Sequence, residues 1–145
     1  MAVTILYTTQ ATATGGGQSG HVSTGDGAID VAFGVPRELG GNGRGNNPEQ
    51  FFAAAFATCF LGAMRYVVAQ DRLDPIAPEA AVTATVGIGP RDDGGFGLAL
   101  ALDVLLPGYS EESARKLFER SHFYCPYTNA VAGNVAVETR LIGHA

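Results

Sequence analysis

The chain has 145 residues, the size of a single domain, and 46% of them are hydrophobic, which is enough for one sizeable core. Nine Lys and Arg residues stand against 14 Asp and Glu residues, so the formal net charge is −5. This charge leaves no excess of cations for a phosphate backbone, and we expect no nucleic-acid partner. Two cysteines are too few for a disulfide scaffold or, alone, for a four-ligand zinc site. We therefore expect one domain over residues 1–145.

The N-terminus lacks the basic start and the continuous apolar stretch of a secretory signal, so we expect a cytoplasmic protein. The most apolar window, residues 51–64, is shorter than the roughly 18 residues of a membrane span. Arg65 closes this window. We therefore expect a buried helix here and no association with a membrane.

The first third of the chain predicts strands and turns. Residues 3–8 and 28–33 are rich in β-branched side chains that alternate with their neighbours, which favours strands. The glycine-rich residues 15–27 between them are interpreted as a turn segment. A second glycine-rich run, residues 40–47, predicts a loop, because so many glycines disfavour both a helix and a central strand.

A strong helix start follows that loop. Asn47 is a suitable N-cap, Pro48 suits the first helical position, and Gln50 stands where a capping box needs it. We predict a helix over residues 48–70. Its faces between residues 51 and 64 are apolar almost all round, so this helix is expected to run through the core.

The second half of the chain predicts a β-hairpin, a helix and a last strand. The hairpin joins residues 81–89 to residues 96–106, and Ser110 then caps a helix that reaches about residue 122. A strand over residues 134–142 ends the chain. The order β-β-β-α-β-β-α-β predicts an α+β fold with helices packed on a largely antiparallel sheet.

The two cysteines have two interpretations. Cys59 lies in the middle of the apolar helix, where a cysteine commonly serves as a small hydrophobic core residue. Cys125 follows the second helix, in an irregular turn that contains Pro126 and aromatic residues. One thiol in a core helix and another at a helix exit also suit a reactive cysteine and a resolving cysteine. The sequence leaves both interpretations open.

Other kinds of site find less support. His122 and Cys125 are three residues apart, but no second paired motif accompanies them, so we expect no zinc site. Neither glycine-rich segment has the GxxxxGK[ST] spacing of a phosphate-binding loop, and neither has a GxGxxG motif that opens a helix. The GxSxG motif of many serine hydrolases is absent from the sequence.

Glu49 is the acidic residue at the start of the core helix, where a carboxylate interacts favourably with the helix dipole. In a continuous helix, its ten-residue separation from Cys59 corresponds to a rise of about 15 Å. Glu49 therefore does not reach Cys59 of its own chain. A site that contains both residues needs a second subunit or a break in the helix.

Motifs that run in order over nearly the whole chain resemble those of the organic hydroperoxide resistance proteins, the Ohr branch of the Ohr/OsmC family. NPEQ together with the two cysteine motifs is the most specific part of the resemblance. The matching segments are ATATGG at 11–16, PRELGG at 36–41, NPEQFFAA at 47–54, CFLGA at 59–63, VGIG at 86–89, GGFGL at 94–98 and CPYTNA at 125–130.

The resemblance implies a thiol peroxidase of alkyl and fatty-acid hydroperoxides, built as an OsmC-like intertwined homodimer with active sites at the subunit interface. It implies that Cys59 is the peroxidatic cysteine and Cys125 the resolving one, joined by an intrachain disulfide, with Glu49 in the same site. The expected reductant is dihydrolipoamide or a lipoylated protein, with no bound metal, haem or flavin. Aromatic residues expected to line the substrate site are Phe51, Phe52, Phe56, Phe60 and Phe123.

The sequence departs from the family at one position. The family has an arginine in the first glycine turn, where this chain has Gly17 or Gln18. Because a thiolate needs a nearby positive or hydrogen-bonding group, Gln18 or Arg44 is a candidate substitute. Two alternatives remain: a dimeric binding or stress protein of the same fold without turnover, and a hydrolase or transferase that keeps its activity without its cysteines.

Overall fold

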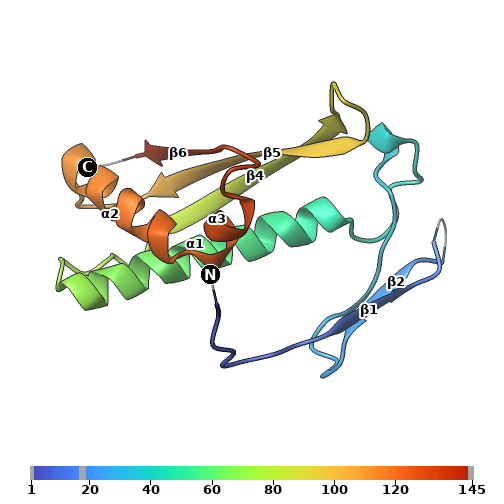
Figure 1. The fold of residues 1–145 in the computed structure, drawn as a ribbon, viewed down its shortest axis with the longest axis horizontal. Helices are drawn as coiled ribbons and strands as arrows, with labels where there is room; N and C mark the ends of the chain where they lie inside the picture. The colour runs from blue at the N-terminus through green and yellow to red at the C-terminus, as the bar shows by residue number, and fades with distance from the viewer. Residues whose placement is uncertain (1, 17–18, 144–145) are drawn as a thin grey trace. The chain divides into compact units, whose positions relative to one another are not determined.

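The computed structural model describes residues 2–16 and 19–143 (Figure 1). The chain divides into two compact units, Met1–Phe51 and Phe52–Ala145. The observed elements are three short strands, a long helix, a β-hairpin, two further helices and a last strand. This is the mixed α+β class that the order of predicted elements indicates, and the expectation of a single domain stays a prediction.

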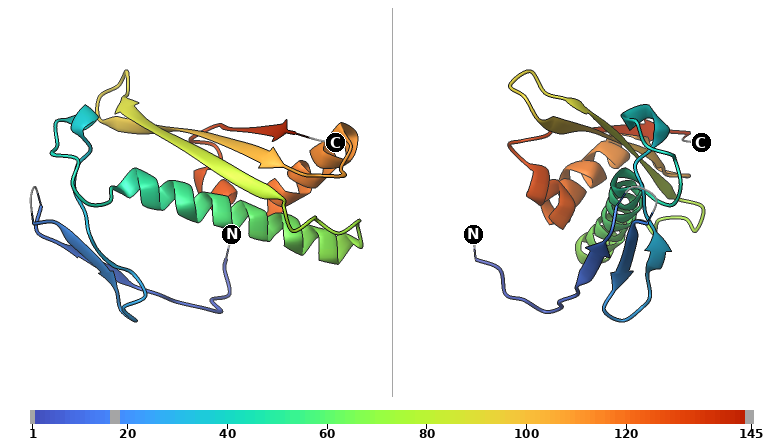
Figure 2. Two further views of the ribbon diagram at one scale, coloured as in Figure 1. Left: turned by 180° about the vertical axis from the view of Figure 1, so that it is seen from behind. Right: turned by 90° about the vertical axis from the view of Figure 1, so that its right-hand side faces the viewer.

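The N-terminal unit contains a three-stranded antiparallel sheet of β1 (Ala11–Thr14), β2 (His21–Thr24) and β3 (Asp30–Ala32), in that order (Figure 2). The prediction of a strand at residues 3–8 was wrong for this chain. Those residues have a β-type sequence, but no strand of the described chain pairs with them. The turn prediction for residues 15–27 was also wrong in part, because β2 lies within them.

Glycine is required where β2 begins. Phe33 N–H donates to the carbonyl oxygen of Gly20 over 3.0 Å, which brings the two backbones together. A Cβ atom on Gly20 would lie 2.3 Å from the oxygen of Phe33, closer than real Cβ contacts. Any other residue at this position would push the start of β2 away from the residue that follows β3.

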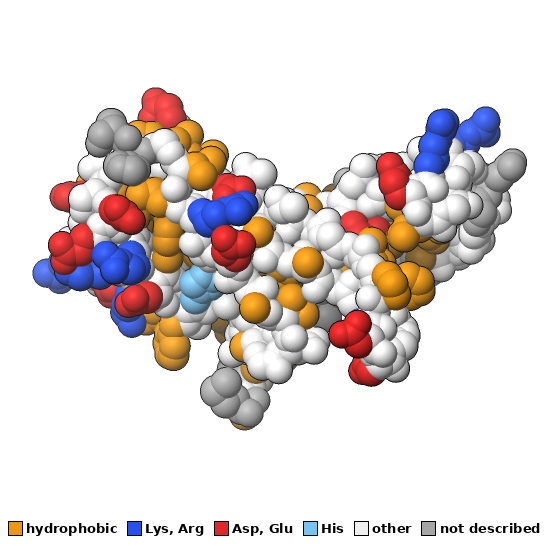
Figure 3. All heavy atoms as spheres, turned by 90° about the horizontal axis from the view of Figure 1, so that it is seen from above, with side chains coloured by type: hydrophobic (Ala, Val, Ile, Leu, Met, Phe, Trp, Pro, Cys, Tyr) orange, Lys and Arg blue, Asp and Glu red, His pale blue; other side chains and the backbone are white. Residues whose placement is uncertain are grey.

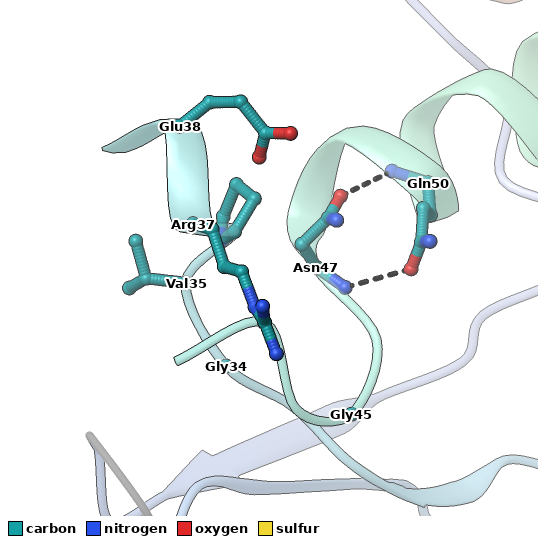
Figure 4. A pocket seen from close by; sticks show the side chains of 9 residues that line it. Gly34, Val35, Arg37, Glu38, Gly45, Asn47 and Gln50 are labelled. Carbon is teal, nitrogen blue, oxygen red and sulfur yellow. Dashed lines mark hydrogen bonds between the residues drawn. The ribbon is translucent and has the colours of Figure 1, made fainter. Parts of the chain in front are cut away.

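The capping box before the long helix forms as predicted. The backbone N–H of Gln50 donates to Asn47 Oδ1 over 2.9 Å, and the backbone N–H of Asn47 donates to Gln50 Oε1 over 3.0 Å (Figure 4). Two donors that the first helical turn leaves unpaired are thus satisfied. A short 3-10 helix, η1 (Arg37–Leu39), precedes the glycine-rich loop of residues 40–47.

The long helix α1 (Pro48–Asp71) has 24 residues and follows the predicted bounds closely. The expectation that it is buried nearly all round was wrong within one chain, because its small residues Ala54 and Gly62 are exposed. One stripe of the helix faces the core of the C-terminal unit. The buried stripe consists of Phe56, Phe60, Ala63, Met64 and Val67.

By length and composition, α1 is also the one helix in the described residues that is able to cross a membrane. Core helices of soluble proteins meet the same criteria. The buried stripe on α1 packs in the core cluster together with residues of the sheet.

The C-terminal unit contains a second three-stranded sheet in the order β4 (Ala81–Pro90), β5 (Phe96–Leu105) and β6 (Val137–Ile142). β4 and β5 form the predicted antiparallel hairpin, but β5 and β6 are parallel. Among the described strands, the prediction of a largely antiparallel arrangement is confirmed, because three of the four strand pairings are antiparallel. The parallel pairing of β6 follows from its connection, because two helices lie between β5 and β6 in the chain. The helices lie on one face of this sheet (Figures 1 and 2).

The helices after β5 are α2 (Glu111–Tyr124) and α3 (Pro126–Val131). Ser110 caps α2 as predicted, with its hydroxyl accepting from the N–H of Ser113 over 3.1 Å. Helix α3 replaces the irregular turn that the sequence predicted. Pro126 suits the first turn of a helix because its missing N–H would be unpaired there, so the same proline that suggested a turn begins a helix.

Charges on the surface are mixed. The face shown in Figure 3 carries acidic and basic side chains next to one another, and its described part has no continuous basic patch. Arg140 and Asp103, on neighbouring strands, form a two-contact ion pair at 2.7 and 3.0 Å. Arg120 and Asp71 form a similar pair between α2 and the end of α1.

Candidate active site

The structure brings the two cysteines together in the C-terminal unit. Cys125 Sγ–H donates to Cys59 Sγ over 3.6 Å, and both residues are free thiols. A disulfide requires a sulfur–sulfur distance of about 2.05 Å, so a movement of about 1.5 Å would join them. The sulfurs belong to residues 66 positions apart in the sequence, and this contact is the central feature of the candidate site.

Local hydrogen bonds explain why Cys125 points toward α1. Its N–H donates to the carbonyl oxygen of Ser121 over 2.8 Å and ends α2, and its own carbonyl accepts from Asn129 N–H over 3.0 Å and begins α3. Cys125 therefore occupies the joint between two helices with its backbone held on both sides. Its side chain is fully buried there.

Cys59 differs from Cys125 because it is half-buried and borders an open cavity. The cavity has a volume of about 300 Å³. Small residues on α1 leave the space, and two tyrosines with rings 5.1 Å apart border it. Cys59 therefore lines the cavity, whereas Cys125 is fully buried and does not line it. The residues around the cavity are Cys59, Gly62, Ala63, Tyr66, Tyr124 and Pro126.

Burial raises the pKa of the Cys59 thiol to about 11. The backbone N–H of Tyr127 hydrogen-bonds Cys59 and lowers the pKa, whereas the hydrogen bond from Cys125 raises it. The burial effect is the largest, so within one chain Cys59 is a protonated thiol near neutral pH. A nucleophilic thiolate at this position requires an additional positive charge or hydrogen-bond donor.

The charged residues predicted for the site lie in the N-terminal unit, not in the unit that contains the sulfurs. Glu49 is half-buried in the first turn of α1, and α1 has no break between Pro48 and Asp71. Arg44 is exposed, and its backbone N–H donates to Asn42 Oδ1 over 2.9 Å. Gln18 lies outside the described residues.

A different arginine borders a cavity in the N-terminal unit. Arg37 lies beside Asn47 and Gln50 in a pocket of about 250 Å³, together with Glu38 (Figure 4). Arg44 does not belong to the lining of this pocket. Arg37 and Arg44 therefore have different surroundings within this unit.

The five phenylalanines predicted to line the site lie in four different surroundings. Phe52 and Phe56 lie against each other and against Tyr127, with ring centroids 6.0 to 6.2 Å apart. Phe123 is 76% exposed and contacts the ring of Tyr124. Phe60 is fully buried against the His122 ring at 4.8 Å, while Phe51 is half-buried in the N-terminal unit.

His122 has different partners from those of a metal ligand. Its Nδ1 atom lies 3.2 Å from Thr128 Oγ1, and its Nε2 atom lies 2.7 Å from Thr139 Oγ1. Both ring nitrogens are therefore engaged by hydroxyl groups. Among the described residues, no group of three or more His, Cys, Asp or Glu side chains is arranged to hold a metal ion.

Two groups near the sulfurs were missed by reasoning from sequence. The N–H of Tyr127 contacts Cys59, and the His122 ring links three segments around the thiol pair. The spacing of His122, Cys125, Tyr127 and Thr128 in HFYCPYT is a local signal for this arrangement.

Comparison with known proteins identifies the family. The family model described as OsmC-like protein matches residues 40–140. An organic hydroperoxide resistance protein of Xanthomonas axonopodis pv. citri is 46% identical over 94% of this chain and 95% of its own length. The crystal structure of an organic hydroperoxide resistance protein from Elizabethkingia anophelis is 41% identical, with a TM-score of 0.88 over 96% of this chain and 98% of that one.

Another similar structure, from Vibrio cholerae, is described as an organic hydroperoxide resistance protein with captopril bound in one of the active sites. It is 40% identical, with a TM-score of 0.88 over 99% of this chain and 96% of that one. The family match, the sequence identity and the shared fold agree with the motifs of the sequence and with the α+β architecture. The chain therefore belongs to the OsmC-like family, among relatives named organic hydroperoxide resistance proteins.

Proposed function

We propose that this protein is a thiol-dependent peroxidase that reduces alkyl and fatty-acid hydroperoxides to alcohols. The observation that carries the proposal is the contact of two free thiols at 3.6 Å, with only Cys59 of the two bordering an open cavity. The names of the relatives support the same class of substrate. In this proposal Cys59 is the peroxidatic residue and Cys125 is the resolving one.

The reaction has two steps in the protein. The Cys59 thiolate attacks the terminal oxygen of R–O–OH, the O–O bond breaks, and the leaving RO⁻ takes a proton to become the alcohol while Cys59 becomes a sulfenic acid. The Cys125 thiol then attacks the Cys59 sulfur, a disulfide forms, and the hydroxyl leaves as water with one proton. Two electrons pass from the two thiols to the peroxide.

A dithiol completes the cycle, and we propose dihydrolipoamide or a lipoylated protein for this role. One thiolate of the dithiol attacks the disulfide, and its second thiol releases the protein in the reduced form as the lipoyl disulfide forms. Cys59 borders the cavity and Cys125 is buried, so the dithiol attacks the sulfur of Cys59. No bound cofactor takes part in this scheme.

The proposal includes an intertwined homodimer, because one chain leaves the Cys59 thiol with a raised pKa. In the unbroken helix α1, Glu49 is ten positions, or about 15 Å of rise, before Cys59. We therefore propose that Glu49 acts from the second subunit. Arg44 or Gln18 is proposed to supply the stabilising group that replaces the arginine of the family. We also propose that the protein is cytoplasmic, because cysteines stay reduced in the cytoplasm.

A count of free thiols tests the proposal. Addition of cumene hydroperoxide is expected to remove two thiols per wild-type chain, whereas Cys59→Ser keeps its remaining thiol and loses turnover with dihydrolipoamide. Cys125→Ser is expected to give a sulfenic acid on Cys59 without a disulfide. In the same assay, Arg44→Ala is compared with the neighbouring Arg37→Ala, and only Arg44→Ala is expected to slow the reaction. Equal effects of the two substitutions exclude a special role for Arg44.

A second candidate is a dimeric binding or stress protein of the same fold without turnover. The raised pKa of Cys59 favours it, as does a mainly apolar cavity of about 650 Å³ on the hairpin side of the C-terminal unit. Phe52, Ile88, Leu98, Val131 and Val135 are among the residues that line this cavity. Unchanged thiols after addition of hydroperoxide, together with binding of an apolar ligand, support this candidate and contradict the peroxidase.

A further inference from the structure

His122 lies three residues before Cys125 and contacts several elements of the C-terminal unit. It is half-buried in the last turn of α2 and packs on Phe60 of α1 at a centroid distance of 4.8 Å. Its two nitrogens contact Thr128 in α3 and Thr139 in β6. One side chain therefore joins four elements of the C-terminal unit.

The chemistry of these contacts suits a neutral ring. A threonine hydroxyl both donates and accepts, so one ring nitrogen of a neutral histidine donates to one threonine while the other nitrogen accepts from the second. Phe60, Thr128 and Thr139, which contact the ring, are uncharged. Burial lowers the pKa of His122, so the ring stays neutral near neutral pH.

The bridge from His122 to Thr128 crosses the joint that holds Cys125. His122 lies three residues before Cys125, and Thr128 lies three residues after it. Their hydrogen bond therefore connects α2 to α3 across Cys125, and we call this His122–Thr128 bridge the clasp. The bond to Thr139 fixes this clasp to the sheet. Within the clasp, Tyr127 presents its N–H and Cys125 presents its sulfur to Cys59.

We propose that His122 is a positioning residue for the thiol pair. Its hydrogen bonds to Thr128 and Thr139 hold the first residues of α3 in place. In that position, the N–H of Tyr127 and the sulfur of Cys125 both contact the sulfur of Cys59. The inference rests on the proposed peroxidase function for its catalytic meaning. The positioning itself is a property of the reduced thiols and is measurable without any peroxide.

Loss of the clasp has two consequences. The first residues of α3 become more mobile, so the hydrogen bond from the N–H of Tyr127 to the Cys59 thiolate weakens. The pKa of Cys59 therefore rises further. Cys125 also spends less time within reach of the Cys59 sulfur, so the disulfide forms more slowly after oxidation. A typical hydrogen bond corresponds to a change of roughly threefold to tenfold in the acid dissociation constant of Cys59 and in the rate of disulfide formation.

The test uses histidine variants that keep or remove single bonds. His122→Phe removes both hydrogen bonds and keeps an aromatic ring against Phe60, whereas His122→Asn keeps a polar atom near the place of Nδ1 and its bond to Thr128. Thr128→Val and Thr139→Val remove the hydroxyls with little change of shape. Thr85→Val, at an exposed position of β4, is the matched control.

The first measurement is the rate of Cys59 alkylation by iodoacetamide against pH, in a Cys125→Ser background and without peroxide. We expect the alkylation pKa to rise in His122→Phe and Thr128→Val, to recover in His122→Asn, and to remain unchanged in Thr85→Val. The second measurement is the rate of disulfide formation after one equivalent of hydroperoxide in chains that keep Cys125. We expect it to fall roughly threefold to tenfold in His122→Phe.

Urea unfolding of each variant shows that the comparison is made between folded proteins. Wild-type values of both the alkylation pKa and the closure rate in folded His122→Phe would overturn the proposal. If the alkylation pKa shifts in the variants but the wild-type protein has no peroxidase turnover, the result supports the positioning role and contradicts the proposed function. The two inferences therefore fail in distinguishable ways.

Discussion

The two units of the molecule differ in what they bury. Every buried hydrophobic side chain of the described residues belongs to the C-terminal unit, from Phe56 to Cys125. The described residues of the N-terminal unit bury only Gly20 and Gly34, while Leu6 and Tyr7 are 95% and 78% exposed. The C-terminal unit thus has its own core, whereas the N-terminal unit has apolar side chains without a core. In the proposed homodimer, the second subunit would be the layer that covers the N-terminal unit.

The glycines show the same contrast. Gly20, Gly34 and Gly41 of the N-terminal unit each lie so close to a carbonyl oxygen that a Cβ atom would clash with it. In the C-terminal unit, Gly62 and Gly89 have open space around them. Close backbone contacts therefore define the N-terminal unit, and side-chain packing defines the C-terminal unit.

The largest expected effect comes from the same substitution in both units. Leu102→Ala empties a fully buried position on β5 and is expected to lower the free energy of unfolding by about 2–5 kcal/mol. Leu6→Ala changes a 95% exposed side chain and is expected to alter it by less than about 0.5 kcal/mol in the monomer. Urea titrations measure both values.

Protein concentration sharpens this prediction. If a second subunit covers residues 3–8, Leu6→Ala becomes more destabilising as the concentration rises, because dimer formation then contributes to stability. A large effect of Leu6→Ala on the monomer would contradict the contrast between the units. A small effect of Leu102→Ala on the free energy of unfolding would also contradict the contrast between the units.

A second pair of substitutions is expected to give opposite signs. Gly20→Ala forces a methyl group against the oxygen of Phe33 and is expected to cost about 1–3 kcal/mol. Gly62→Ala has open space on an exposed helix position and is expected to stabilise the isolated chain by about 0.8–1.0 kcal/mol. Thermal unfolding at low protein concentration measures both effects. Destabilisation by Gly62→Ala would show that another chain packs against this part of α1.

The smallest expected effect is a dependence of stability on pH. Burial in the C-terminal unit lowers the pKa of His122 below its ordinary value of 6.5, so the unfolded chain binds this proton more readily than the folded chain. The free energy of unfolding is therefore expected to fall as the pH falls below about 6.5, and the contribution vanishes at higher pH. A single group limits the slope to about 1.4 kcal/mol per pH unit.

Urea midpoints at several pH values between about 5 and 8 measure this slope in the wild type and in His122→Gln. The glutamine variant does not titrate, so it is expected to lose the part of the slope that His122 contributes. Identical slopes in the two proteins would show that the ring is as accessible to protons in the folded state as in the unfolded state.

Local signals in the sequence predicted those parts of the fold that depend on neighbouring residues. The capping box of Asn47 and Gln50, the cap at Ser110 and the hairpin around residues 90–95 are each formed by hydrogen bonds within a few positions. The strand expected at residues 3–8 failed because a strand needs a partner, which local pattern does not supply. Helix α3 was missed because Pro126 suits both a turn and a helix start.

The candidate site was predicted from the residue types and from the resemblance of the motifs, and its geometry was not. The sequence by itself determined that Cys59 lies on an apolar helix and that Cys125 follows another helix, because caps and periodicity are local. Only the tertiary structure decided that the two sulfurs touch, that β6 runs parallel to β5, and that burial raises the pKa of Cys59. These features depend on packing between segments far apart in the chain, which local hydrogen bonds and periodicity do not encode.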